Sequence, residues 1–474
     1  MSTTALRDQP TKLRSAPERW WIMGVALAAC ALQARTIGPG LWWDDMHHAR
    51  PWRLSEALGT FAGPFDPLGI EPSYFRPLTV MTFWLDWNVW GFTAWGYHVT
   101  NVVLVAAAVT LLYVFLRQLP IPRTAVLAGV LYFCIAPSNV ATSTYISERS
   151  DALVAIFVLG ALCLTGRHYL APKARNRWVL LGLFVLAVCS KELGVVLPVL
   201  CALYWWALHI IRPLGNQAID PADGVAADAG LARVSVPLQQ WRAAATDRLM
   251  LRGAVQFLWP AVAAIPAYLV YRFVVLSGDN ALPADNAGVN PAKGLVLTLK
   301  SALQSTPWEL QNRSLPFLLV LIVVGIVAAR SRTSIHLVLF ATITLVAACI
   351  PLAPVGKVEP RLLFMPQIAV ALLVAAIAST LVSWINAFRT SLRSATRPTA
   401  LHTISLVTVL AIACGFVATT AYTFVQAQDM WQPGAAKMLE GDLQLWNDVA
   451  NRGKYPQRYV EQVEQRLSEA GLLP

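Results

Sequence analysis

The chain has 474 residues, of which 56% are hydrophobic and only 13% are charged, and its mean hydropathy is +0.53. In soluble domains about a quarter of the residues are charged. No soluble core could bury apolar runs as long and as numerous as these. The composition therefore excludes a water-soluble enzyme, a disordered chain and a disulfide scaffold. It predicts an all-α protein that crosses the membrane several times.

The formal net charge is +11, from 37 Lys and Arg against 26 Asp and Glu. In a membrane protein such an excess is explained by basic residues that collect in short cytoplasmic loops. No basic stripe with interleaved aromatic residues suggests nucleic-acid binding. All seven cysteines fall inside apolar runs, which indicates small buried side chains rather than a disulfide or metal framework.

A membrane span needs about 20 mostly apolar residues. The basic residues before the first apolar run also suit a cleaved signal peptide, but the many later spans favour a retained signal anchor. A buried Lys or Glu at mid-membrane is costly, so we expect a turn at 190–192. The expected spans number about eleven, and they lie near 20–37, 98–116, 124–138, 151–165, 178–189, 193–211, 254–276, 315–329, 335–352, 362–385 and 401–425.

The charges of the connecting segments predict the topology. Tight loops such as 117–123 and 389–397 hold almost only basic charge, as cytoplasmic loops do. The expected organisation is a cytoplasmic N-terminus (1–19), a transmembrane domain (20–425) with external loops at 38–97 and 276–314 and a cytoplasmic loop at 212–252, and an external C-terminal tail (426–474).

The first external loop is long, and loops of this length are uncommon unless they are functional. Its stretch Thr79–Trp95 places four tryptophans among polar residues. This pattern predicts an interfacial helix on the outer leaflet. The alternative is the aromatic belt that any membrane protein carries. Two further short helices are expected in the tail, near 435–449 and 459–470.

The acidic pair Asp44 and Asp45 follows the first span directly. Two adjacent carboxylates at an interface repel each other and lose hydration, which suits one of them to general-base work or to metal coordination. The alternative is a helix-capping Asp44 and a solvated Asp45. The neighbouring His47 and His48 could add metal ligands, but adjacent histidines point apart, which favours a solvated pair.

Four more charged clusters lie at the expected outer ends of spans. They are Arg76 beside Pro77, SERSD at 147–151, SKE at 190–192 and KVEPR at 357–361. An arginine beside a stiff turn can present its guanidinium to a phosphate, although it can also snorkel to lipid headgroups. The other clusters could be ion pairs of little consequence. Their shared side predicts that they converge on one interfacial cavity.

Six blocks, in this order, resemble the GT-C superfamily of integral-membrane glycosyltransferases. The likeness is strongest to the TMTC-like and bacterial relatives of protein O-mannosyltransferases. The blocks are WWDDMHHARPW, YFRPL, WGYHVTNVVL, YISERSDALV, SKELGVVLPVL and VEPRLLFMPQ, which cover most of 38–205 and return near 355–370. The resemblance implies a bundle of transmembrane helices whose large first external loop carries interfacial helices.

The resemblance also implies a transferase that moves a sugar from a polyprenyl-phosphate donor to an acceptor hydroxyl at the outer face. The implied membrane is the bacterial inner membrane, with the site facing the periplasm. Asp44 or Asp45 would be the catalytic carboxylate. The cations at the donor phosphate would be Arg76, Arg149, Lys191 and Arg361, and the supporting residues Glu148, Glu192, His98 and Asn101.

The implied partners are this donor, a protein, lipid or glycan acceptor and the bilayer. No cofactor is implied. Relatives with a diphosphate donor need a divalent metal, which nothing in the sequence indicates. A second hypothesis is a transporter or flippase of a lipid-linked or polar solute. Transporters usually carry inverted repeats and charge at mid-membrane, whereas this sequence shows no matching halves and its outer charges lie on one side.

Overall fold

The structure is a computed structural model, and it describes residues 16–37, 45–63, 65, 74–91, 93–215, 247–275, 290–304, 332–354, 360–393 and 400–431, with a few isolated positions beyond them. Every element in these ranges is helical. The chain therefore has the all-α fold class that its composition predicts. Most of the expected span at 315–329, most of the loop at 212–252 and nearly all of the expected tail helices lie outside the described residues.

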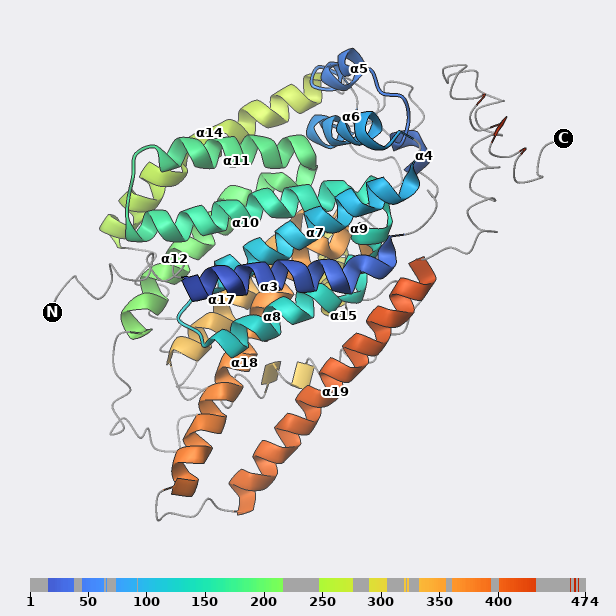
Figure 1. Ribbon diagram of the computed structural model, residues 1–474. Coiled ribbons are helices and arrows are strands. Elements are labelled where there is room, and N and C mark those ends of the chain that lie inside the picture. The colour runs from blue at the N-terminus through green and yellow to red at the C-terminus, as the bar shows by residue number, and fades with distance from the viewer. Residues whose placement is uncertain are drawn as a thin grey trace.

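Long apolar helices make up most of the bundle (Figure 1). They are α3 (Ala16–Gln33), α7 (Ala94–Leu116), α8 (Arg123–Ile135), α10 (Arg149–Leu170), α11 (Asn176–Ser190), α12 (Leu197–Gly215), α14 (Arg248–Val275), α17 (Arg332–Cys349), α18 (Phe364–Arg393) and α19 (Ala400–Trp431). In the centre α18 packs between α8 and α17, and α10 packs against α7 and α11.

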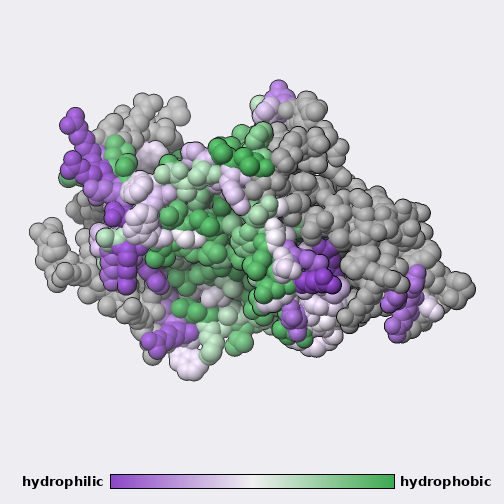
Figure 2. Space-filling view, turned by 90° about the horizontal axis from the view of Figure 1, so that it is seen from above, coloured by the Kyte–Doolittle hydropathy of each residue, from purple (hydrophilic) through white to green (hydrophobic). Residues whose placement is uncertain are grey.

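Seven of these helices are long and apolar enough to cross a membrane, or eight with one bent pair, within the described ranges. The expected number of eleven is thus not confirmed. The helix α11 has only 15 residues, although it coincides with an expected span. Figure 2 shows a broad apolar band between two polar sides, as an integral membrane protein requires.

The bent pair corrects one expected boundary. The third span was expected to end near residue 138, but the chain turns by 57° and continues as α9 (Pro137–Thr144), which packs against α19. The cause is Pro137, because proline cannot donate to the preceding turn and disfavours helical backbone at the residue before it. Ala136 is accordingly extended, with φ −64° and ψ 119°.

The described part of the segment expected as the first external loop forms several short helices at one end of the bundle, which we call the loop end. Figure 1 shows α4 (Asp45–His48), α5 (Leu54–Gly59) and α6 (Pro77–Trp90) together there. The helix expected over Thr79–Trp95 is α6, but it ends at Trp90, and Trp95 lies at the start of α7. Gly91, which follows Trp90, has a positive φ of 55° that suits a residue without a side chain.

The expected break between the fifth and sixth spans is also present at the loop end. The helix α11 stops at Ser190, Lys191 is extended, and the 3-10 turn η3 (Glu192–Val196) leads into α12. A second 3-10 turn, η2 (Ile146–Glu148), precedes α10. The helix α15 (Pro291–Gln304) lies in the segment expected as the second external loop.

The opposite end is held by one buried carboxylate. Glu18 accepts hydrogen bonds from Arg117 Nε at 2.9 Å and Tyr113 Oη at 2.7 Å, and it pairs with Arg123. The Glu18 carboxylate thereby joins α3 to the end of α7 and the start of α8. Burial raises the pKa of Glu18, but the hydrogen bonds and charges of the arginines outweigh it, so the net shift is downward.

We expect Glu18→Gln to destabilise the bundle by about 2 kcal/mol, because it leaves two partly buried arginines without their counter-ion. The measurement is the melting temperature in detergent. Glu56→Gln is the control, since Glu56 is exposed and its carboxylate accepts the local Arg53 N–H at 2.9 Å. Equal melting temperatures for Glu18→Gln and the wild type would contradict this assignment.

Candidate active site

The loop end is organised around a buried ion pair between Arg149, the first residue of α10, and Asp86 on α6. Arg149 Nη2 lies 2.7 Å from Asp86 Oδ2, and the Arg149 side chain has no exposed surface. Its Nε donates to Asn101 Oδ1 at 3.0 Å, and its guanidinium lies 4.2 Å from the centroid of the Phe83 ring. Arg149 therefore joins α6, α7 and α10.

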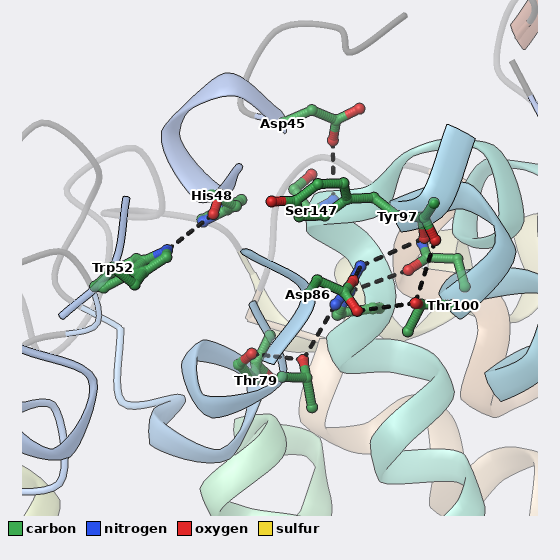
Figure 3. A network of polar contacts seen from close by, with 12 residues as sticks. Asp45, His48, Trp52, Thr79, Asp86, Tyr97, Thr100 and Ser147 are labelled. Atoms are coloured by element: carbon green, nitrogen blue, oxygen red, sulfur yellow. Dashed lines mark hydrogen bonds and ion pairs between the residues drawn. The ribbon is translucent and has the colours of Figure 1, made fainter. Parts of the chain in front are cut away.

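The partners of this pair are themselves held by hydrogen bonds. Thr100 Oγ1 donates to Asp86 Oδ1 at 2.9 Å, and Asn101 Nδ2 donates to the carbonyls of Thr142 and Tyr145 at 3.2 and 3.3 Å. Figure 3 shows Asp86 facing this network. The network fixes α6 to the start of α7 and to the segment that follows α9. Asn101, expected as a supporting residue, is part of it.

A short series of hydroxyls continues from Arg149 to the break after α11. Arg149 Nη1 lies 3.4 Å from Thr82 Oγ1, and Thr82 donates to the carbonyl of Thr79 at 2.7 Å. Thr79 Oγ1 in turn donates to the carbonyl of Ser190 at 3.0 Å. The helix α6 is thus attached to two helices of the bundle, α10 and α11.

Asp45 lies against the turn that precedes α10. Its Oδ1 accepts the backbone N–H of Ser147 at 2.9 Å, and Figure 3 shows the carboxylate pointing at that residue. Asp45 also interacts electrostatically with Arg149, and its side chain is buried. The alternative of a solvated Asp45 is therefore wrong. Asp44 lies outside the described residues.

His48 corrects a second expectation. The sequence favoured a solvated histidine pair, but His48 is buried and its ring stacks on Phe83, with centroids 4.6 Å apart. Its carbonyl accepts from Trp52 Nε1 at 2.8 Å. Phe65 and Phe83 pack against the His48 ring and remove it from water. These contacts come from distant parts of the chain, so the sequence alone did not show them. The side chain of His47 lies outside the described residues.

Lys191 is buried between two carboxylates. Its Nζ forms an ion pair with Asp151 and lies 3.6 Å from Glu148 Oε2. The extended backbone at the break after α11 places Lys191 beside the start of α10. Two of the predicted clusters, SERSD and SKE, therefore meet in space.

Arg76 is the most exposed of the predicted cations described at the loop end. Its Nη2 lies 3.3 Å from Glu192 Oε2, its guanidinium lies 4.2 Å from the centroid of Tyr74, and 14% of its side chain is exposed. Arg272 of α14 approaches the other oxygen of Glu192, at 3.8 Å. Burial is the largest single influence and lowers the pKa of Arg76, but the charges of Glu192, Glu148 and Asp151, together with Tyr74, outweigh it, so the net shift is upward. Arg76 therefore remains a cation.

Several buried hydroxyls around these charges have no hydrogen-bond partner within the described part of the chain. They belong to Thr142, Thr144, Ser147 and Ser150. The carboxylate oxygen Oδ1 of Asp151 is also buried without a hydrogen-bond partner in this part of the chain. Buried polar atoms are rarely left unpaired. The interior of the loop end is therefore suited to water or to the polar atoms of a ligand.

The structure brings Asp45, Arg76, Glu148, Arg149, Lys191 and Glu192 to one end of the bundle, together with Asn101. His98 is buried in α7. Arg361 lies in the 3-10 turn η6 (Pro360–Leu363), which packs against α9, but its side chain is outside the described set. Sequence reasoning missed Asp86 and Arg272. The only available signal for Asp86 was a lone carboxylate in a tryptophan-rich helix.

Sequence comparison gives partial matches. No family model matches the chain. Protein O-mannosyl-transferase Tmtc1 of Drosophila melanogaster is 26% identical over 208 residues, which are 42% of this chain and 24% of Tmtc1. Protein O-mannosyl-transferase F38B6.6 of Caenorhabditis elegans is 31% identical over 126 residues, 26% of this chain and 17% of that protein. The matches thus span about a quarter or less of these relatives.

Structural comparison covers more of the chain. The archaeal oligosaccharyltransferase AglB from Archaeoglobus fulgidus, solved with an inhibitory peptide and a dolichol-phosphate, matches 94% of this chain and 60% of its own, with a TM-score of 0.52 and 14% identity. AglB has a GT-C fold. The chain therefore has a fold like that of the GT-C membrane glycosyltransferases, and in sequence it resembles the TMTC protein O-mannosyl-transferases.

Proposed function

We propose that the chain is a membrane glycosyltransferase that moves a sugar from a polyprenyl-phosphate donor to an acceptor hydroxyl, at the outer face of a bacterial inner membrane. One observation carries the proposal. Asp45, from the first external loop, is held at the Ser147 N–H at the same end of the bundle as Arg76 and Lys191. A carboxylate and cations together are what such a transfer needs.

Each charged group has one role in this reaction. Asp45 or Asp44 takes the proton of the acceptor hydroxyl while the hydroxyl oxygen forms a bond to the anomeric carbon. The bond between that carbon and the phosphate oxygen breaks, and its electron pair leaves with the lipid phosphate. A cation that faces the leaving oxygen stabilises the charge that develops there.

The candidate cations differ in how deeply their side chains are buried. Arg149 has no exposed surface and its guanidinium is engaged by Asp86 and Asn101, so we assign it to positioning α6 over the site. Lys191 is nearly buried between Asp151 and Glu148. Arg76 retains exposed surface, and we assign it to the donor phosphate. That Arg361 assists and that no metal is needed both stay predictions.

We expect Asp45→Asn to lower sugar transfer about a hundredfold or more, because it removes the proton acceptor while it retains a side chain that can accept the Ser147 N–H. The measurement is transfer of label from a radiolabelled polyprenyl-phosphate hexose in membranes. Asp44→Asn is assayed in parallel, because the sequence does not separate the two carboxylates.

Asp429→Asn is the matched control, since Asp429 is an exposed carboxylate whose partner is Arg35. It should transfer sugar at the wild-type rate. If Asp44→Asn and Asp45→Asn both fold and both retain full transfer, the assignment of the acidic pair is wrong.

We expect Arg76→Gln to raise the KM for the polyprenyl-phosphate donor about tenfold, because one charge-assisted hydrogen bond to the phosphate is lost. Arg76→Lys keeps the charge and should recover part of the loss. Donor titrations at saturating acceptor measure both variants. An unchanged KM for the donor in folded Arg76→Gln would remove Arg76 from the donor site.

A further inference from the structure

Two arginines at the loop end share a single carboxylate. Glu192 pairs through Oε2 with Arg76, from the first external loop, and through Oε1 with Arg272 of α14. The neighbouring Lys191 has carboxylates of its own, Asp151 and Glu148. The two arginines of the Arg76–Glu192–Arg272 triad therefore share Glu192 as their direct counter-ion, while the second carboxylate beside Lys191 balances the charge of the wider cluster.

The triad also holds unused hydrogen-bond donors. Arg272 Nε is buried and has no hydrogen-bond partner within the described ranges. The hydroxyl of Tyr268, one helical turn earlier on the same face of α14, is also buried and also has no hydrogen-bond partner within the described ranges. Tyr268 is 9% exposed. Tyr268 interacts electrostatically with Glu192, Arg76 and Arg272, so its hydroxyl belongs to this cluster.

Buried donors without acceptors, beside two arginines that share one carboxylate, suit an anion, because the oxygens of the anion can accept from these donors. An arginine and a tyrosine hydroxyl can bind different oxygens of one phosphate, as the fixed donor geometry of arginine favours. Glu192 lies between the two guanidinium groups, where an anion would bind.

The surroundings indicate that the phosphate belongs to a lipid. Next to Tyr268 and Arg272, α14 exposes Leu269, Val270, Phe273 and Val274, among the residues that the structure describes. These side chains suit a hydrocarbon chain rather than water. The hydroxyl of Tyr271 donates to the carbonyl of Phe61, which fixes this part of α14 to the loop end, where Figure 1 shows α14 ending beside α5.

We propose that Arg272 and Tyr268, together with Arg76, form the subsite for the phosphate of a polyprenyl phosphate, and that Glu192 is the internal counter-ion which this phosphate displaces. This inference rests on the proposed function, because it names where the donor of that reaction is held. The polyprenyl chain then runs along the exposed face of α14.

The test measures binding without transfer. Radiolabelled polyprenyl monophosphate, which has no sugar, is bound to purified protein in phosphatidylcholine nanodiscs. We expect Arg272→Gln to weaken binding about tenfold and Tyr268→Phe to weaken it about threefold. Glu192→Gln should instead tighten binding, because the competing carboxylate is gone. A purely structural role for the triad predicts that none of these variants tightens binding.

Arg252→Gln is the matched control, since Arg252 is an exposed arginine at the other end of α14, and it should bind like the wild type. Unchanged binding in folded Arg272→Gln, or weaker binding in Glu192→Gln, would overturn the inference. Displacement of the label when phosphatidylglycerol replaces phosphatidylcholine would assign the cations to ordinary headgroups and would also overturn it.

The two proposals can fail separately. If the wild type transfers sugar but Arg272→Gln binds the monophosphate normally, the subsite is wrong and the transferase stands. If the binding pattern holds but no sugar is transferred to any acceptor hydroxyl, the chain binds a lipid phosphate at this subsite and the transferase reaction is wrong.

Discussion

The buried ion pair between Arg149 and Asp86 is the interaction on which the loop end depends. A charge without exposed surface is tolerated only when it is paired and its remaining donors are bonded. Asp86, Asn101 and the Phe83 ring meet that requirement, and they come from α6 and α7. The buried arginine thus holds α6 against the bundle, beside the start of α10.

This constraint has a consequence for the chemistry. Because α6 is fixed, Arg76 at its N-terminal end reaches Glu192, and the loop before it can place Asp45 on the turn that begins α10. Catalysis of group transfer needs its charges held before the substrate arrives. Arg149 is fully buried in its ion pair, whereas Arg76 keeps part of its side chain exposed beside Glu192.

The sequence predicts some of this arrangement and not the rest, for physical reasons. The break at Lys191 is predictable because a lysine and a glutamate at mid-membrane would be costly, and Asn101 is visible as part of a family block. The role of Asp86 is not predictable, since nothing in the local sequence distinguishes a buried carboxylate from a solvated one on a helix expected at the interface. The role of Arg272 depends on how α14 packs, which no pattern of charges reveals, and the outcome at His48 depends on aromatic neighbours from other helices.

A double-mutant cycle on Asp86→Asn and Arg149→Gln tests the central claim most directly, with the free energy of unfolding in mild detergent as the measured quantity. The account predicts that each single change costs about 3 kcal/mol, because it leaves a buried charge unpaired. The double variant should then lose about 2 kcal/mol less than the sum. Strictly additive losses, or single variants as stable as the wild type, would contradict the claim that this pair holds the loop end together.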